Sequence, residues 1–356
     1  MHWVATGELI NPVILPRFMA KRKYNQKARA LQPAVMKLNF VVDAPGAAGY
    51  STSYISISHC VSQLNRRFYR QGLNWAVANV KVTMQPAAAG GSTYTLNTIP
   101  HTWSVANAWQ KTFSLWKKQQ DEALEATDSL ETVARYRDFK ISMEEGHVVG
   151  TDLRPVNLGP GRNPLGPIPL GILASEDMLG SEEWVSSEIV IPNDGGPGVA
   201  GQYDLHMVGP DAGAPVNSKG MIHGYQESRA TPTSPDPSGP IISGSFLAEM
   251  FDVGSTLDEV AVNAQNRNDE LPYDQDEYPG GSTNFVELET QGYAWNQSTV
   301  GINSYNSGPF TAPCGLLRID FSNQAPQAGT QNHNYITVTL VPGNHRGYLA
   351  ETMGEF

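Results

Sequence analysis

Short runs with strand character, separated by turns, recur along the whole chain and constrain its fold more than any other feature. In residues 35–43, Met36, Leu38, Phe40 and Val42 occupy every second position, which is the period of a half-buried strand. In residues 73–84 the phase of the alternation changes near Ala78-Asn79, which predicts a β-bulge there. We expect strands at 35–43, 73–84, 94–99, 135–143, 184–192, 203–208, 221–225, 316–321 and 334–341.

Two segments have clear helical rather than strand periodicity, and a third could hold a short helix. In residues 56–71 the apolar side chains recur every three or four positions, and Gly72 is placed to cap the C-terminus of a helix. Residues 104–127 predict a second helix, and 247–265 a short one. Strands do not alternate regularly with helices, so a parallel α/β sheet is not expected.

The expected fold is therefore mainly β: an antiparallel jelly-roll sandwich with long loops and two inserted short helices. The 34 Gly and 25 Pro are scattered without a period, as many turns require. We expect a basic N-terminal arm at 1–34, a jelly-roll shell domain with loop insertions at 35–345 and a C-terminal tail at 346–356.

Charge is divided unevenly along the chain. Residues 1–81 carry 11 basic and 2 acidic side chains, whereas residues 82–356 carry 13 basic and 33 acidic ones. A basic N-terminal part joined to an acidic body indicates two surfaces with different partners, and a polyanion suits the basic one.

The basic side chains of the first part form two groups. Residues 17–29 contain six basic side chains, no acid and no amphipathic period, which is typical of an extended arm that binds nucleic acid without reading its sequence. Phe18 and Tyr24 could stack on unpaired bases. A solubilising tail or a localisation signal is the alternative interpretation. The predicted nucleic-acid-binding residues are Arg17, Lys21, Arg22, Lys23, Lys27, Arg29, Lys37, Arg66, Arg67 and Arg70.

The sequence contains none of the common catalytic motifs: no GxSxG, GxxxxGK[ST], HExxH or GxGxxG pattern is present. The two cysteines, Cys60 and Cys314, are too few for a disulfide framework and are expected to be buried apolar residues. The acidic cluster at 269–277 could hold a hard cation, but a solvated surface or a subunit contact is the preferred interpretation. We expect no cofactor, no metal site and no enzymatic activity, although a glycosidase-like carboxylate pair stays open.

No run of the chain reaches the roughly 20 apolar residues that a membrane span needs. The first 16 residues also lack the apolar stretch of a signal peptide. We therefore expect synthesis in the cytosol and no insertion into a membrane.

Several motifs occur together in a recognisable order. They are residues 62–72 (SQLNRRFYRQG) with Trp75-Ala-Val, 98–103 (TIPHTW) with Asn107-Ala-Trp109 and 122–126, 273–281 (YDQDEYPGG), 312–316 (APCGL) and the ending Val341-Pro-Gly, Arg346-Gly and Leu349-Ala-Glu351. In this order the chain resembles the capsid proteins of uncultured small circular Rep-encoding single-stranded DNA viruses, over roughly residues 35–353.

The resemblance implies a jelly-roll subunit that assembles with copies of itself into a small icosahedral shell around single-stranded DNA. The arm would face the interior, and the protein would reside in the virion after assembly in the host cytoplasm or nucleus. A host receptor would be a further partner, whose identity the motifs do not indicate. Residues 1–37 carry seven basic and one acidic side chain, fewer than the arms of many such capsids, so Arg66, Arg67 and Arg70 are expected to add to charge balance.

Two other functions compete with the coat-protein hypothesis. A carbohydrate-binding or carbohydrate-active jelly-roll protein would use Trp75, Trp103, Trp109 or Trp295 as a stacking platform. A cellular nucleic-acid-binding protein that does not assemble is the other. Imaging for particles distinguishes both from a coat protein.

Overall fold

The computed structural model describes residues 33–43, 49–84, 86, 91–126, 138–150, 152–156, 185–194, 198–230, 287–298, 301–322 and 333–353. The chain divides into two units, Met1–Ala30 and Leu31–Phe356, and all the described residues belong to the second. The helix expected at 247–265 and the acidic cluster at 269–277 lie outside the described residues.

The larger sheet is built around the long strand β3 (Leu73–Met84). Strand β12 (His333–Leu340) lies between β3 and β1 (Lys37–Asp43), and β15 (Ala350–Thr352) continues along β3 beyond β12. On its other side β3 pairs with β9 (Asn303–Asn306) and then with β10 (Phe310–Ala312). All these pairs are antiparallel, and the register skips Ala78, which confirms the predicted bulge.

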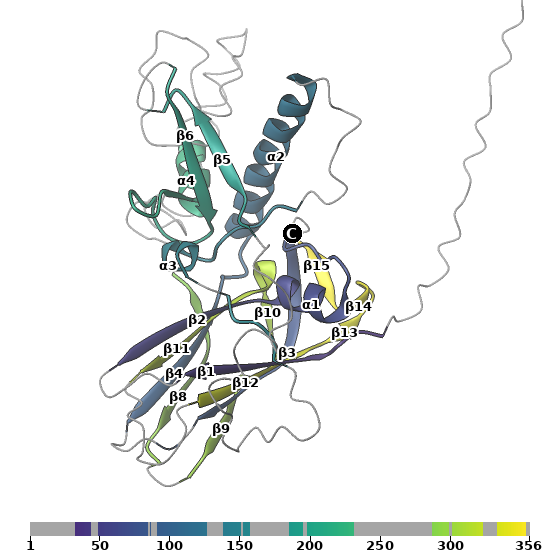
Figure 1. Cartoon of the computed structure of the whole chain (residues 1–356), viewed down its shortest axis with the longest axis vertical. Coiled ribbons are helices and arrows are strands. Elements are labelled where there is room, and N and C mark those ends of the chain that lie inside the picture. The colour runs from purple at the N-terminus through teal and green to yellow at the C-terminus, as the bar shows by residue number, and fades with distance from the viewer. Residues whose placement is uncertain are drawn as a thin grey trace, which may run out of the picture. The chain divides into compact units, whose positions relative to one another are not determined.

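The second sheet has the order β2 (Tyr50–Ser56), β11 (Leu316–Ser322), β4 (Ser92–Thr98) and β8 (Glu289–Asn296) (Figure 1). It is also antiparallel throughout. The described part of the chain is therefore mainly β, with antiparallel sheets, as expected from the alternating patterns.

One apolar core lies between these sheets. Leu38, Phe40 and Val42 of β1 are buried in it together with Leu96 of β4 and Phe321 of β11. The alternate residues of the same strands are more exposed, because successive side chains of a strand point to opposite faces. Burial of the apolar face, at about 25 cal/mol per Å² removed from water, fixes which face of each strand points inward.

A short segment spans the edges of both sheets on one side. The Leu153 N–H donates to the Tyr54 carbonyl of β2, and the Val156 N–H donates to the Asn39 carbonyl of β1, both at 2.7 Å. The segment thus satisfies backbone groups that edge strands would leave unpaired.

A long insertion separates β4 from β8. Its described elements are α2 (Trp103–Ala126), α3 (Glu145–Val148), β5 (Glu188–Pro192), β6 (Ala200–His206), β7 (Ser218–Gly220) and α4 (Met221–Ala230). The insertion has a second core, in which Trp116 of α2, Phe139, Ile189, Leu205 and Tyr225 pack together. In Figure 1, α2 and α4 lie beside the β5–β6 pair.

Three predicted elements differ from the structure. The predicted strand at 221–225 belongs to helix α4, whose residues Met221, Ile222 and Tyr225 are buried at helical spacing. Of the predicted strand at 135–143, residues 138–143 carry no ladder, only a single bridge from Ser142 to His206. Helix α1 spans Ile57–Asn65 and not 56–71.

Strands β2, β8, β9 and β10 were not predicted. The predicted tail at 346–356 also begins with strand residues, because β13 (Pro342–Gly343) pairs with β14 (Gly347–Tyr348) and β15 pairs with β3. Tyr348 is fully buried in the main core, so this part of the chain is integral to the fold.

Candidate nucleic-acid interface

The arginine cluster predicted on a helix lies in the loop that follows it. Arg66 adopts a left-handed conformation (φ 51°, ψ 43°) that ends α1, and the Arg67 N–H donates to the Ser62 carbonyl at 3.2 Å. The Ser62 hydroxyl accepts from the Tyr69 N–H at 3.0 Å. The loop thereby turns back and buries Tyr69, while Arg66, Arg67 and Arg70 are exposed.

Tyr69 explains why the helix is short. Its ring packs at 5.5 Å from the Tyr348 ring and 6.1 Å from the Trp75 ring in the main core. A helix continued to residue 71 would carry this ring around the helix axis and away from that position. Gly72, predicted as a helix cap, instead leaves room for Trp109, whose ring lies 2.1 Å from where a Cβ would be.

Val35, near the start of the described residues, lies beside this loop. The Val35 N–H donates to Asn65 Oδ1 at 3.0 Å, and the Val35 carbonyl accepts from the Tyr348 hydroxyl at 2.6 Å. Asn65 also donates to the Tyr348 hydroxyl at 2.7 Å. Position 35 is thus fixed next to the residue that precedes Arg66, and Lys37 is exposed two residues later.

A fifth cation comes from the other end of the chain. The Arg346 guanidinium donates to the Phe68 carbonyl, and the Arg346 carbonyl accepts from the Tyr69 hydroxyl at 3.1 Å. Arg346 was not predicted as a binding residue, because sequence shows only an Arg-Gly turn and not its contact with a loop some 280 residues away. We call Lys37, Arg66, Arg67, Arg70 and Arg346 the arm-root patch.

The structure thus brings together four of the predicted residues, Lys37, Arg66, Arg67 and Arg70, and adds Arg346. All five are exposed, and Arg66 and Arg70 form no ion pair with any described residue. The other six predicted residues, Arg17, Lys21, Arg22, Lys23, Lys27 and Arg29, lie outside the described residues. In the sequence they precede Lys37, the first residue of the patch.

One carboxyl group lies close to the patch. Burial raises the pKa of Asp138 to about 6, although Lys140 and Arg70 act in the opposite direction. Its Oδ2 atom is buried and has no hydrogen-bond partner among the described residues. Asp138 is therefore largely ionised near neutral pH and offsets the charge of Arg70, an effect that is lost as the pH falls below about 6.

A separate hollow of about 310 Å³ is lined by two histidines, a residue type that often acts in catalysis. His59, His147 and Asp152 line it, together with Lys140 and Arg154. The Met143 N–H donates to His147 Nδ1 at 3.0 Å, and His147 Nε2–H donates to Asp152 Oδ1 at 2.8 Å. Because both ring nitrogens are engaged, His147 is not placed to act as a general base.

Burial raises the pKa of Asp152, but the hydrogen bonds and charges of His147 and His59 outweigh it and hold this pKa well below its usual range. The His147 ring also stacks on Tyr54 of β2, with ring centroids 4.3 Å apart. The cluster thus fastens the turn at α3 to the sheet, which is a structural role.

A second, partly buried polar network has the same role. Arg318 of β11 donates to both oxygens of Glu144 at 2.8 and 2.9 Å and to Asp320 Oδ1 at 3.0 Å. Asp320 also accepts from Thr52, Thr95 and Asn97. Every carboxylate oxygen of Glu144 and Asp320 is engaged by these donors, so the two carboxylates do not resemble the acid and base of a glycosidase.

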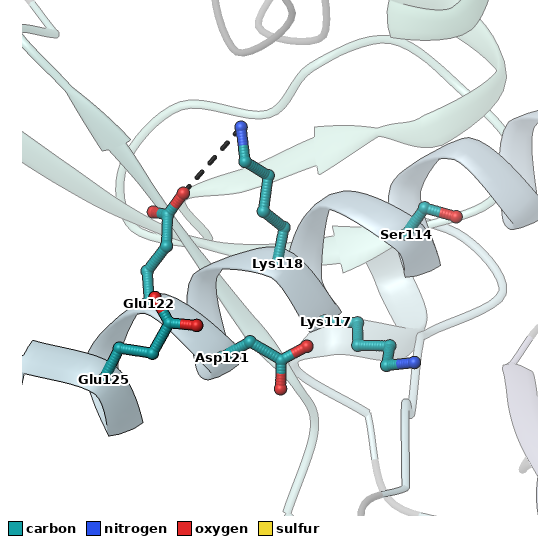
Figure 2. A pocket seen from close by; sticks show the side chains of 6 residues that line it. All are labelled: Ser114, Lys117, Lys118, Asp121, Glu122 and Glu125. Carbon is teal, nitrogen blue, oxygen red and sulfur yellow. Dashed lines mark ion pairs between the residues drawn. The ribbon is translucent and has the colours of Figure 1, made fainter. Parts of the chain in front are cut away.

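The outer face of α2 carries charges of both signs (Figure 2). A shallow hollow of about 500 Å³ is lined by Ser114, Lys117, Lys118, Asp121, Glu122 and Glu125. Lys118 and Glu122 pair at 3.8 Å and are both more than half exposed. This is a solvated helix face, where such pairs contribute little to stability.

Within the described ranges, no group of three or more His, Cys, Asp or Glu is placed to hold a metal ion. None of the described helices has the length and apolar character to span a membrane. Both cysteines are buried and unpaired by disulfide, as expected. Comparisons with family models, curated proteins and solved structures found no match to this chain.

Proposed function

We propose that this chain is a viral coat protein with a jelly-roll fold, which assembles with copies of itself into a small icosahedral shell and packages single-stranded DNA. Its location would be the virion, and it would act without enzymatic chemistry. The fold part and the nucleic-acid part of the proposal rest on different observations.

The fold part rests on the pairing of the strands. With the short C-terminal β15 set aside and β9 and β10 counted as one interrupted strand, the two large sheets contain eight successive strands. The first pairs with the eighth, the second with the seventh, the third with the sixth and the fourth with the fifth. Such nested pairs arise when one long hairpin is rolled up, which is the jelly-roll topology used by viral capsids and by lectins. The pairs β12–β3 and β11–β4 then close the roll.

The observation that carries the functional part is the arm-root patch. A segment with six basic residues lies at 17–29 in the sequence, and the described part of the chain that follows it exposes four arginines and Lys37. Lys and Arg that neutralise phosphates release counterions, so such a concentration of cations favours binding to nucleic acid of any sequence.

The carbohydrate alternative gains less support. Trp75 is fully buried in the main core, and Trp103 and Trp109 pack against the second core. Trp295 is 56% exposed on β8, so of the four tryptophans considered for a stacking platform one is available.

Electron microscopy of the purified full-length chain tests the proposal. We expect closed particles of uniform size that contain nuclease-protected DNA. Deleting residues 1–34 should reduce the protected DNA per particle. A monodisperse monomer without particles, or particles with unchanged DNA content after the deletion, would contradict assembly and the role of the arm respectively.

A further inference from the structure

The outward face of the β2–β11–β4–β8 sheet carries two exposed aromatic rings at its β8 edge. Trp295 is 56% exposed and Tyr293 is 62% exposed, although side chains of this size usually bury most of their apolar surface. They are two residues apart on one strand, so they leave the same face of the sheet about 7 Å from each other. The two rings therefore form an exposed apolar strip along β8.

The Trp295 ring lies against the backbone of Gly91. A Cβ at Gly91 would be 3.3 Å from the indole Nε1 atom and 3.9 Å from two of the ring carbons, so the glycine leaves room for the ring. The Gly91 N–H donates to the carbonyl of Asn296, the residue after Trp295, at 3.2 Å. The indole is thus supported by backbone on one side while more than half of its surface faces solvent, which makes it a preformed platform for stacking.

Beside the strip, the face consists of uncharged hydroxyl and amide side chains. The strand register places them in rows that begin at the two rings and cross β4 and β11 toward β2. They are Thr93, Thr95 and Asn97 of β4, Ser322 of β11, Thr52 of β2 and Thr290 of β8. We call these six residues, together with Trp295 and Tyr293, the aromatic-hydroxyl face.

The carboxylate of Asp320 orients the hydrogens of this face from below. Asp320 is 5% exposed and accepts from Thr52 at 2.8 Å, from Thr95 at 3.3 Å and from Asn97 at 3.2 Å. Thr290 donates in turn to Asn97 Oδ1 at 2.8 Å. A hydroxyl group that donates its single hydrogen within the face keeps its oxygen lone pairs for a donor from outside. The threonines therefore present hydrogen-bond acceptors in fixed places.

The charges next to this face neutralise one another. Arg318 pairs with Glu144 at 2.8 Å and with Asp320 at 3.0 Å. The further acid of β8, Glu289, is exposed at the first position of the strand, in register with the inward-facing Thr98. The described residues of the face thus present acceptors and rings but no cation that is free of a carboxylate. This polarity complements an uncharged ligand that donates hydrogen bonds, and it does not complement a phosphate.

Aromatic rings beside fixed acceptors are suited to sugars. The C–H side of a pyranose packs on an aromatic ring, while its hydroxyl groups donate to neighbouring oxygens. We infer that the aromatic-hydroxyl face binds a neutral oligosaccharide, with Trp295 and Tyr293 stacked on successive sugar rings. Thr95 and Thr290 accept from the sugar hydroxyls. The inference goes beyond the proposed function, because on a coat protein this face would attach the particle to the glycans of a cell surface.

The test applies the full-length chain, labelled with a fluorophore, to an array of immobilised neutral, sialylated and sulfated oligosaccharides. We expect binding to neutral oligosaccharides that is unchanged between about 0.1 and 1 M salt, because contacts without charge are not screened. The neutral oligosaccharide that binds best is then used in titration calorimetry. Trp295→Ala and Tyr293→Ala should each weaken its binding about tenfold or more, and Trp295→Phe should retain most of the affinity. Thr290→Val should weaken binding about threefold.

Matched controls come from strand β12 of the other large sheet. Tyr335→Ala removes an outward-facing tyrosine ring. Thr337→Val removes a threonine that donates to Asn39 Oδ1 at 2.9 Å, the same kind of bond that Thr290 makes with Asn97. Neither control should change the affinity for the oligosaccharide.

Absence of binding to every neutral oligosaccharide of the array, binding confined to the acidic ones, or equal losses in the controls would overturn the inference. So would loss of particles in Trp295→Ala and Tyr293→Ala with undiminished oligosaccharide binding, because the face would then be a contact between copies of the chain. These failures leave the proposed function standing if the unsubstituted chain forms particles that contain DNA. Oligosaccharide binding by a chain that forms no particles would support the inference and contradict the proposed function.

Discussion

At the scale of single residues, Asp138 gives the clearest link between burial and pH. It precedes Phe139 of the second core in the chain, and one of its carboxyl oxygens is buried with no hydrogen-bond partner among the described residues. Burial therefore raises its pKa from 3.8 to about 6. The native state binds this proton more tightly than the unfolded chain does.

Stability should accordingly fall as the pH rises from about 4 to about 6, and stay constant above that range as far as Asp138 is concerned. Asp138→Asn should remove this loss and raise the free energy of unfolding at pH 7 by about 1–3 kcal/mol. Urea unfolding at several pH values measures the effect. A variant whose stability falls between pH 4 and 6 as steeply as that of the unsubstituted chain would contradict it.

Gly72 shows how a residue can be required for a reason that sequence does not reveal. The Trp109 ring occupies the space of a Cβ, at 2.1 Å from its ideal position, and Trp109 itself is stacked on Phe113. Gly72→Ala must displace this ring or the loop that follows the arginines. We expect a loss of about 1–3 kcal/mol in the free energy of unfolding, the usual range for overpacking.

Combining Gly72→Ala with Trp109→Leu identifies the cause. A smaller side chain at 109 should make the alanine at 72 nearly neutral, so the two effects should be strongly non-additive. Additive losses in urea unfolding would mean that the glycine is needed for its backbone and not for the tryptophan.

At the scale of elements, strands with a strong apolar alternation were predictable and strands without one were not. The boundaries of β3 agree with the predicted 73–84, because Trp75, Val77, Val80 and Val82 mark both phases around the bulge. Strand β2 has serines at two of its inward positions, Ser51 and Ser53, opposite Phe321 and Ile319. Its apolar pattern is therefore too weak to be recognised.

Strand β8 was missed for the opposite reason. Its large aromatics, Tyr293 and Trp295, are more than half exposed, whereas the alternate positions facing inward are the small Gly292 and Ala294. A pattern read as apolar-in would assign this strand to the wrong face. The same limit applies to the candidate interface, since Arg346 joins it through its contact with the Phe68 carbonyl, which no local pattern specifies.

The polar network around Asp320 connects α3 with the second sheet and should be costly to break. Asp320 is 5% exposed and accepts hydrogen bonds from Arg318, Thr52, Thr95 and Asn97. Asp320→Ala would leave the half-buried Arg318 guanidinium and three other donors without this acceptor. We expect a loss of about 2–5 kcal/mol in the free energy of unfolding, measured with urea.

Glu125→Ala on the exposed face of α2 is the matched control for this carboxylate and should change stability by less than about 0.5 kcal/mol. Equal stability of the Asp320 and Glu125 variants would mean that the network contributes nothing beyond surface pairing.

At the scale of the whole molecule, the sequence indicates an uneven distribution of charge and the structure gives it a location. The described part of residues 1–81 contributes Lys37, Arg66, Arg67 and Arg70 to the arm-root patch, while Glu144 and Asp320 are engaged at the β2–β11–β4–β8 sheet. Nested strand pairing brings Lys37, Arg66 and Arg346 together although they lie in three distant parts of the sequence.

Because the arm carries a modest charge, substitutions in the arm-root patch give the decisive test of how DNA is packaged. Residues 1–37 carry seven basic and one acidic side chain, so the arm neutralises few phosphates per subunit. Arg66 and Arg70 are exposed and form no ion pair with a described residue, so Arg66→Gln with Arg70→Gln should leave folding intact. Particles of this variant should form and contain less DNA, seen as a lower ratio of absorbance at 260 to 280 nm.

Substituting Lys117 and Lys118 on α2 by glutamine removes the same charge elsewhere and should leave the DNA content unchanged. If both variants package as much DNA as the unsubstituted chain, the patch does not contribute to charge balance and the arm alone must provide it.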